Sequence, residues 1–267
     1  TGSSPKTFIN KMDKATAKRI VAYDGVPTAR FQLMKPQDRL RDLAFPLMVK
    51  PYSEGTSIGI NQKSKVNNLA ELEQAIETIF TQFNQPALVE EFLDGKEYTI
   101  GFIGNYLLPI LEIDFAKIPG QPQLRDPYVK SIENPFISHL PWNEKARSFA
   151  SLAIKAHEAL EVRDYNRMDF RERDGQLYFL EANVIPGLHP TEADLTNMCR
   201  HAGVAHADMV VLILSAAVKR LSEQYPERFK KKTELLTELA NKAICKATHA
   251  GEIVYQDRVY KLLGKLF

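Results

Sequence analysis

The chain has 267 residues, of which 44% are hydrophobic and 25% are charged, the composition of a globular protein with a substantial core. Lys and Arg number 35 against 33 for Asp and Glu, so the formal net charge is only +2. This balance gives no electrostatic basis for binding nucleic acid or an anionic membrane surface, and we expect neither as a partner. Any anionic ligand would have to be held by local geometry.

The terminal residues and the cysteines favour a soluble, cytoplasmic protein. No run approaches the roughly 20 apolar residues of a membrane span, and the first residues, TGSSPKTF, lack the apolar core of a signal peptide. Cys199 and Cys245 match no metal-binding spacing. Two unpaired thiols are favoured over a disulfide, which indicates a reducing compartment.

The first third of the chain alternates predicted helices and strands. Residues 11–24 have the composition of a helix, ended by Gly25 and Pro27, and a short strand should follow at 28–32. A second apolar strand at 45–50 opens into a glycine-containing loop. The clearest helix is predicted at 69–83, because its apolar residues recur every three or four positions. Those residues are Leu69, Leu72, Ile76, Ile79 and Phe83.

The rest of the chain contains strands, one long loop and further helices. Strands are predicted at 87–92, 98–103 and 107–112. Residues 114–141 contain five prolines and little periodicity, which indicates a long ordered or closing loop. The later predictions are a helix at 144–160, a hairpin ending in LEANVIPG at 180–187, a helical stretch at 206–221, and a tail with an amphipathic helix and a second short element.

The hairpin carries polar residues whose relation depends on its turn. Residues two apart in a strand share a face, so Arg167 points with Asp169, and Glu181 points with Asn183. A two-residue turn at 174–175 would send the two carboxylates to opposite faces. A three-residue loop at 173–175 would place them diagonally side by side, and we choose this three-residue loop.

Asp169, Glu181 and Asn183 are candidate metal ligands. Two carboxylates and an amide oxygen within a few Å would repel one another unless a cation lay between them, and Mg²⁺ accepts oxygen ligands of this kind. The alternative is that both carboxylates lie on a solvated strand face.

The loop EGTSIG at 54–59 is a candidate phosphate site. Its glycines let backbone amides approach a polyanion, and Thr56 and Ser57 add hydroxyl donors. Lys50 ends the apolar strand just before this loop, where a buried charge needs a partner such as phosphate. The alternative is a plain hairpin turn, because the loop lacks the GK[ST] sequence of a Walker loop.

The stretch VEEFLDGKEYTIG at 89–101 is a candidate nucleobase site. The backbone at Glu91 and Leu93 could meet the edge of adenine, and Glu90 and Glu97 could accept hydrogen bonds from the amino group and the ribose hydroxyls. An edge-strand hairpin with solvated acidic residues explains the same residues equally well.

Seven motifs, taken in chain order, resemble those of the ATP-grasp superfamily and, within it, the D-alanine–D-alanine ligases. They are MDK at 12–14, FPLMVKP at 45–51, EGTSIG at 54–59, VEEFL at 89–93, GKE at 95–97, RMD at 167–169 and LEAN at 180–183. Single motifs of this kind are unspecific, whereas this ordered set is specific. The likeness runs from about residue 1 to about residue 221.

The resemblance implies an α+β, ATP-grasp fold in which two α+β lobes clamp a nucleotide. We expect a central lobe at 1–114 with an adenine hinge at 88–97, a C-terminal catalytic lobe at 115–221, and a helical tail of unknown role at 222–267. The D-alanine ligases would also have an N-terminal domain, which leaves open whether such a domain is missing here. A homodimer is left open as well.

The resemblance also implies roles for individual residues. Arg167 would stabilise the transferring phosphoryl group or the tetrahedral intermediate, and Lys130 would reach the γ-phosphate. The metal residues would hold two Mg²⁺ ions, with Mn²⁺ as a substitute. The nucleotide-binding residues would be Lys14 and Lys50 on the phosphates, Glu54, Gly55, Thr56 and Ser57 in the closing loop, Glu90, Glu91 and Leu93 at adenine, and Glu97 at the ribose.

The implied reaction activates a small carboxylate with ATP as an acyl phosphate, which an amine then attacks. Gly187 and Glu192 would lie near the substrate, at and beyond the bend that follows the metal strand. An acidic Glu192 would repel a substrate carboxylate, so we expect an acceptor other than free D-alanine. The alternatives are a carboxylate–thiol ligase or kinase on the same scaffold, and a non-catalytic nucleotide-binding module.

Overall fold

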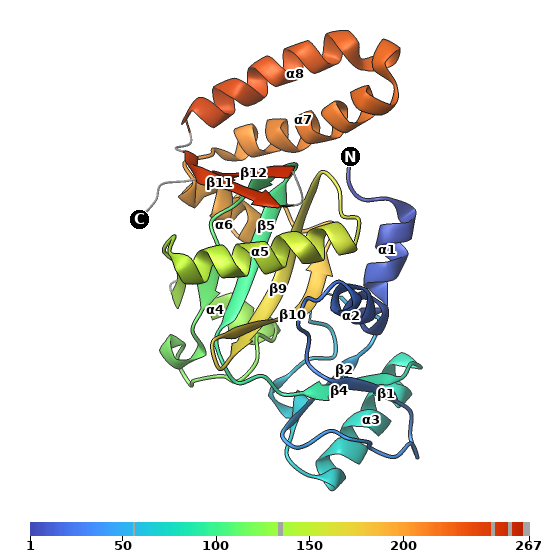
Figure 1. Ribbon diagram of the computed structural model, residues 1–267. Coiled ribbons are helices and arrows are strands. Elements are labelled where there is room, and N and C mark those ends of the chain that lie inside the picture. The colour runs from blue at the N-terminus through green and yellow to red at the C-terminus, as the bar shows by residue number, and fades with distance from the viewer. Residues whose placement is uncertain (56, 133–135, 247–248, 256–257, 264–267) are drawn as a thin grey trace.

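The computed structural model describes residues 1–55, 57–132, 136–246, 249–255 and 258–263, and it contains two β-sheets with helices packed on both (Figure 1). Thr56, expected in the phosphate loop, lies outside the described residues, as does the side chain of Cys245. Cys199 is free and buried. The mixture of helix and sheet confirms the α+β class.

The smaller sheet is antiparallel and has the strand order β1-β4-β2-β3. Its strands are β1 (Phe31–Met34), β2 (Leu47–Pro51), β3 (Lys65–Val66) and β4 (Ala87–Glu91). Helix α3 (Leu69–Phe83) packs on it through Leu72, Ile76 and Ile79, as the periodicity predicted, although Leu69 is exposed. This lobe is the lower part of Figure 1.

The predicted helix at 11–24 is two helices, α1 (Pro5–Met12) and α2 (Lys14–Tyr23). Asp13 separates them, and its extended backbone lets its side chain accept a hydrogen bond from the N–H of Thr16. Gly25 follows α2 with a φ of 76°, which fits a residue just past a helix C-terminus.

The larger sheet has eight strands, with the central order β10-β9-β5-β6-β12-β11; β7 pairs with β5 and β8. We placed 98–113 in the first lobe, whereas these residues pair in this larger sheet. The predicted strand at 107–112 is divided at Pro109, and the predicted loop at 114–141 contains three short elements. The strands are β5 (Glu97–Ile103), β6 (Tyr106–Leu107), β7 (Leu111–Ile113), β8 (Ile137–His139), β9 (Tyr165–Arg173), β10 (Gln176–Asn183), β11 (His249–Tyr255) and β12 (Arg258–Leu263). The other short elements of the loop are η2 (Phe115–Lys117) and α4 (Pro127–Ile132).

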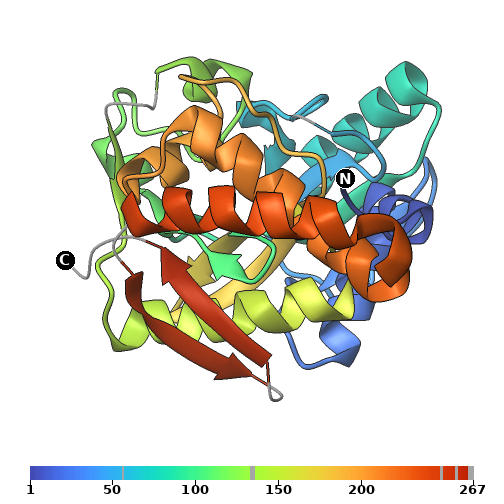
Figure 2. The ribbon, with the colours of Figure 1, turned by 90° about the horizontal axis from the view of Figure 1, so that it is seen from above.

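Helices cover both faces of the larger sheet (Figure 2). Helix α5 (Glu144–Ala159) packs on one face, and α6 (Asp194–His201) and α7 (His206–Gln224) pack on the other. Helix α8 (Pro226–Lys246) lies along α7. In the described part of the chain, no single helix is long and apolar enough to cross a membrane; α6 and α7 pass that test only as a pair bent by 105°.

The hairpin turn differs from the one we chose. Arg173 pairs with Gln176, so the loop has two residues, Asp174 and Gly175, with φ values of 53° and 77° that suit a type I′ turn. The register then shifts between Phe179 and Glu181 through a bulge, and Glu181 pairs directly with Asp169. The three-residue loop was therefore wrong, but the bulge restores the proximity for which it was chosen.

Candidate functional site

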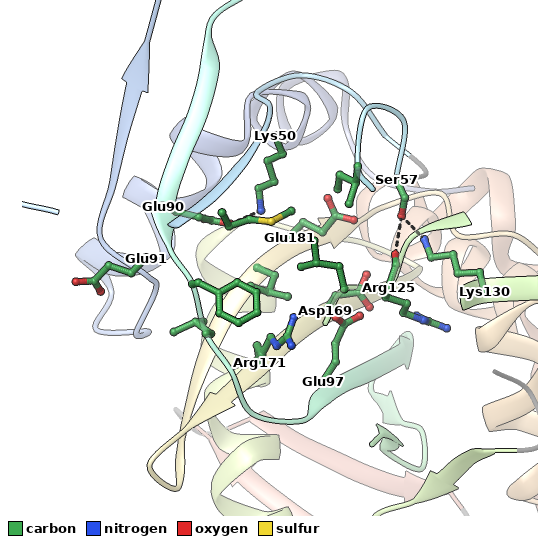
Figure 3. Close-up of a pocket in the computed structure, with 16 residues that line it drawn as sticks. Lys50, Ser57, Glu90, Glu91, Glu97, Arg125, Lys130, Asp169, Arg171 and Glu181 are labelled. Carbon is green, nitrogen blue, oxygen red and sulfur yellow. Dashed lines mark hydrogen bonds and ion pairs between the residues drawn. The ribbon is translucent and has the colours of Figure 1, made fainter. Parts of the chain in front are cut away.

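A pocket of about 700 Å³, counting its open mouth, lies between the two sheets (Figure 3). Strands β2 and β4 of the small sheet and β5, β9 and β10 of the large sheet supply its walls, together with the loops around Ser57 and Arg125. Most of the residues selected from the sequence meet here. Those that line the pocket are Lys50, Ser57, Glu90, Glu91, Leu93, Glu97, Lys130, Asp169 and Glu181.

The three candidate metal ligands lie together at one end of the β9–β10 hairpin. Asp169 and Glu181 are opposite one another in the register, and Asn183 Nδ2 donates to Asp169 Oδ2 at 3.2 Å. Thr99 Oγ1 on β5 donates to the other carboxylate oxygen of Asp169 at 2.8 Å. Neighbouring strands therefore hold the Asp169 carboxylate in a fixed orientation.

Cationic side chains compensate the charge of these carboxylates. Lys14 Nζ lies 3.4 Å from Glu181 Oε2, and an Arg167 nitrogen lies 3.1 Å from Asp169 Oδ2. Burial by itself would raise the pKa of Glu181, but Lys14, Lys50 and other cations outweigh it and hold that pKa well below its ordinary value. The ionised form of Glu181 is therefore favoured.

The donor set fits a hard divalent cation, because it offers carboxylate and amide oxygens on two adjacent strands. In the described residues no three His, Cys, Asp or Glu side chains form a metal-binding group. The candidate ligand set consists of two carboxylates and one amide.

Lys50 pairs with Glu90 inside the pocket, at 2.5 Å. A second lysine, Lys18 on α2, lies 2.9 Å from the other oxygen of Glu90 and is fully buried. Burial would raise the pKa of Glu90, but the two lysines together lower it to about 2. Sequence reasoning missed Lys18, although its i,i+4 spacing from Lys14 places both on one helix face.

The predicted phosphate loop contacts the segment that carries Lys130. Lys130 Nζ donates to Ser57 Oγ at 2.7 Å, and Ser57 Oγ donates to the carbonyl of Arg125 at 3.3 Å. The Glu54 carbonyl accepts a hydrogen bond from Lys14, while its carboxylate accepts one from Gln85 at 2.8 Å. The loop that carries Ser57 is thus joined at one side of the pocket to Lys130 on α4 and to Arg125 just before that helix (Figure 3).

The segment between the sheets carries the predicted nucleobase residues. The Glu91 N–H donates to the Arg30 carbonyl at 3.0 Å, so it is engaged within the protein, and the Glu91 side chain points away from the other labelled side chains (Figure 3). Leu93 and Glu97 are buried. Burial raises the pKa of Glu97, and Arg125 opposes that shift.

Arg167 is held by two carboxylates, of which the sequence indicated only Asp169. Its other partner is Asp194, the first residue of α6, and Asp194 also forms a bidentate pair with Arg125 at 3.0 and 3.2 Å. The three side chains come from β9, α6 and the loop before α4. Asp194 followed no motif, and its acidic position in the first turn of a helix was the one available signal.

Glu192 does not line the pocket. Its side chain is 79% exposed, and its ion-pair partner is His189 at 4.0 Å. Gly187 is exposed at the bend, and a Cβ built there would meet Ala193 Cβ at 3.7 Å, an ordinary contact. Of the acidic residues that follow the bend, it is therefore Asp194, two positions beyond Glu192, that contacts the candidate residue Arg167.

Two sheets that enclose a pocket lined by lysines, arginines and paired carboxylates define an ATP-grasp fold, as solved structures confirm. The chain aligns with D-alanine–D-alanine ligase from Bacillus anthracis with a TM-score of 0.70 at 24% identity, covering 84% of this chain and 73% of that one. The VanG D-Ala:D-Ser ligase of Enterococcus faecalis gives 0.64 at 23% identity, covering 80% and 64%. At this identity the likeness establishes the fold.

Sequence comparison places the chain more closely. The family described as D-ala D-ala ligase C-terminus matches residues 19–215, so the chain belongs to that family. It is 32% identical over 228 residues to the uncharacterized protein y4sG of Sinorhizobium fredii, and 29% identical over 227 residues to the D-alanine–D-alanine ligase of Pediococcus pentosaceus. These matches cover 82% and 84% of this chain but 66% and 63% of the relatives, so the chain spans less than two thirds of their length.

Proposed function

We propose that the protein is part of an ATP- and Mg²⁺-dependent carboxylate–amine ligase that forms an amide or peptide bond through an acyl phosphate. The observation that carries the proposal is the convergence of Asp169 and Glu181 with Lys14 and Arg167 at one end of the pocket. Family membership supports the same reaction class. Pockets that transfer a phosphoryl group need this combination, because charge develops on both reacting oxygens.

In the proposed reaction, a carboxylate oxygen of the first substrate attacks the γ-phosphorus of ATP, and ADP leaves. The amine then attacks the acyl carbon and loses a proton, and phosphate leaves. Asp169, Glu181 and Asn183 would hold two Mg²⁺ ions, which draw charge from the transferring phosphoryl group when bound. Lys14 and Lys50 would bind the phosphates, and Arg167, fixed by Asp194, would face the developing negative charge.

The joined segments would protect the intermediate. An acyl phosphate reacts with water as well as with an amine, so the contact of Ser57 with Lys130 supports a role for these segments in excluding solvent. Our reason for doubting free D-alanine as the acceptor was the charge of Glu192. Because that side chain is exposed, this charge no longer distinguishes between acceptors.

The test measures phosphate release from MgATP in the presence of pools of carboxylates and amines. The protein tested should also include the region of the relatives that this chain does not span. We expect release only when a matching carboxylate and amine are both present. Glu181→Gln should abolish release while the circular dichroism spectrum is unchanged. Release that ignores the amine would instead indicate a kinase or a hydrolase, and stimulation by a thiol would indicate a carboxylate–thiol ligase.

A further inference from the structure

Lys18 has an ammonium group that is completely buried and lies close to three oxygen atoms. It donates to Thr28 Oγ1 at 2.9 Å and to the Phe179 carbonyl at 3.2 Å, and it lies 2.9 Å from Glu90 Oε2. Two of its three N–H groups are thus hydrogen-bonded, whereas Glu90 Oε2 lies at ion-pair distance and accepts no hydrogen bond from the described residues. A buried charge lowers stability unless it has ionic or hydrogen-bonding partners. The oxygens around Lys18 are partners of this kind for an ammonium group.

The partners of Lys18 belong to different lobes. Glu90 is on β4 of the small sheet, whereas Phe179 is on β10 of the large sheet, next to the bulge that brings Glu181 opposite Asp169. Lys18 thus spans the two sheets from α2. All the contacts of Lys18 given above are with protein atoms, and Lys18 does not line the pocket.

Lys50 is placed differently, although it shares Glu90 with Lys18. Lys50 lines the pocket, and in this structure it pairs with Glu90 Oε1. In the proposed function it binds nucleotide phosphate, and a shift of its ammonium group towards that phosphate would weaken its ion pair with Glu90. Glu90 would then keep one cation, Lys18.

We propose that Lys18 is a positioning residue that remains with Glu90 as its permanent counter-ion, so that Lys50 can leave Glu90 for the phosphates of a bound nucleotide. The inference rests on the nucleotide site of the proposed function. Without Lys18, the departure of Lys50 would leave a buried, unpaired carboxylate, and Glu90 would take up a proton. Burial lowers the pKa of Lys18, and Lys50 from β2 adds to that shift, whereas Glu90 from β4 and Glu181 from β10 oppose it.

The test is titration of the protein with MgADP in buffers of different ionisation enthalpy, which counts the protons taken up on binding. We expect Lys18→Met to take up about one proton more per nucleotide than the wild type. Its affinity for MgADP should therefore rise about tenfold for each unit by which the pH is lowered between about pH 8 and pH 6. The wild type should lack this additional slope.

Two further variants locate the effect. Lys18→Met combined with Glu90→Gln should lose the extra proton uptake, because no carboxyl remains to be protonated. Arg19→Met removes a positive charge from the next residue of α2, which is exposed, and should behave as the wild type. A folded Lys18→Met variant with the wild-type proton count and pH profile would overturn the proposal.

A measurement on the wild type covers the case in which Lys18→Met does not fold. Carbon-detected NMR of the glutamate carboxyls should show Glu90 ionised at about pH 6 to 8 both with and without MgADP. Protonation of Glu90 in the wild-type complex would overturn the proposal. If the wild type binds no MgADP, the proposed function is contradicted as well. If MgADP binds and Lys18→Met takes up the same number of protons as the wild type, only the role of Lys18 is contradicted.

Discussion

Asp194 and Glu90 are two carboxylates that each hold two basic side chains. Asp194 joins Arg125 to Arg167, and Glu90 joins Lys18 to Lys50. Removing the charge from such a residue leaves cations in a poorly solvated place, so the loss exceeds that of an ordinary surface pair. These two positions therefore give the clearest predictions for single side chains.

We predict that Asp194→Asn lowers the free energy of unfolding by about 3 kcal/mol, because Arg125 and Arg167 each lose an ionic partner in a buried place. Glu192→Gln is the matched control, since it removes a charge from an exposed side chain two residues earlier, and it should change stability by less than about 0.5 kcal/mol. Urea denaturation measures both. Equal losses of stability in the two variants would contradict the buried ion pairs of Asp194 with Arg125 and Arg167.

Glu90 should make stability depend on pH in the acid range. Its pKa is about 2 in the folded protein and near 4.5 ordinarily, so it stabilises the fold above about pH 4.5. That contribution, of order 3 kcal/mol, is lost as the pH falls from about 4.5 towards 2. Thermal denaturation across this range should show a shallower decline for Glu90→Gln, and an unchanged decline would contradict the low pKa.

At the scale of elements, the turn between β4 and β5 depends on a close backbone approach at Gly95. A Cβ at this position would lie 2.2 Å from the Glu172 carbonyl oxygen on β9. We predict that Gly95→Ala destabilises the protein by about 1–3 kcal/mol and weakens MgADP binding, because the turn that leads to Leu93 and Glu97 must shift. Calorimetry measures both effects, and Asp94→Ala, exposed in the same turn, is the control.

An element could be predicted where a local sequence pattern determines it, and was missed where contacts with distant residues determine it. Helix 69–83 is encoded locally, since its apolar stripe repeats along one face. Helix α6 was missed because its eight residues follow a Pro- and Gly-rich bend and show no extended periodicity. The register of the hairpin was missed for another reason: a bulge beside Leu180 is set by contacts with residues 27–28 and Lys18, which no local pattern records.

Four residues that the motifs marked lie close together in the structure. Lys50, Glu90, Asp169 and Glu181 do meet in one pocket, as expected from the ordered motifs. Glu192 was inferred by counting along the chain beyond the bend, where an extra residue or two in the loop changes which side chain turns inward. The ionic partners of Lys18 and Asp194 lie more than 25 residues away in the sequence, so only the folded chain reveals these pairs.

At the scale of the whole molecule, the tail beyond residue 221 belongs to the core. Tyr260 and Leu262 on β12 are buried in the same cluster as Phe102, and the Tyr260 hydroxyl donates to Glu158 on α5 at 2.9 Å. β12 also pairs with β6 in parallel. The tail thus completes the larger sheet and one of its faces.

We predict that Tyr260→Ala lowers the free energy of unfolding by about 3 kcal/mol, because it empties a buried aromatic site and leaves Glu158 without that donor. Arg258→Ala, on the same strand but exposed, should cost less than about 1 kcal/mol. Denaturation followed by both fluorescence and circular dichroism should give one transition. A loss below about 1 kcal/mol for Tyr260→Ala would show that the tail is a separate unit.

The hydrogen bond between Lys130 and Ser57 has a kinetic consequence. If Ser57 must separate from Lys130 on α4 before a nucleotide enters, the observed association rate should level off with concentration at the rate of this separation. Ser57→Ala should raise that plateau in stopped-flow measurements with a fluorescent nucleotide, and a rate that stays linear would contradict the gate. The same hydrogen bond would then limit hydrolysis of the proposed acyl phosphate. The amine would have to react before Ser57 and Lys130 separate and water enters.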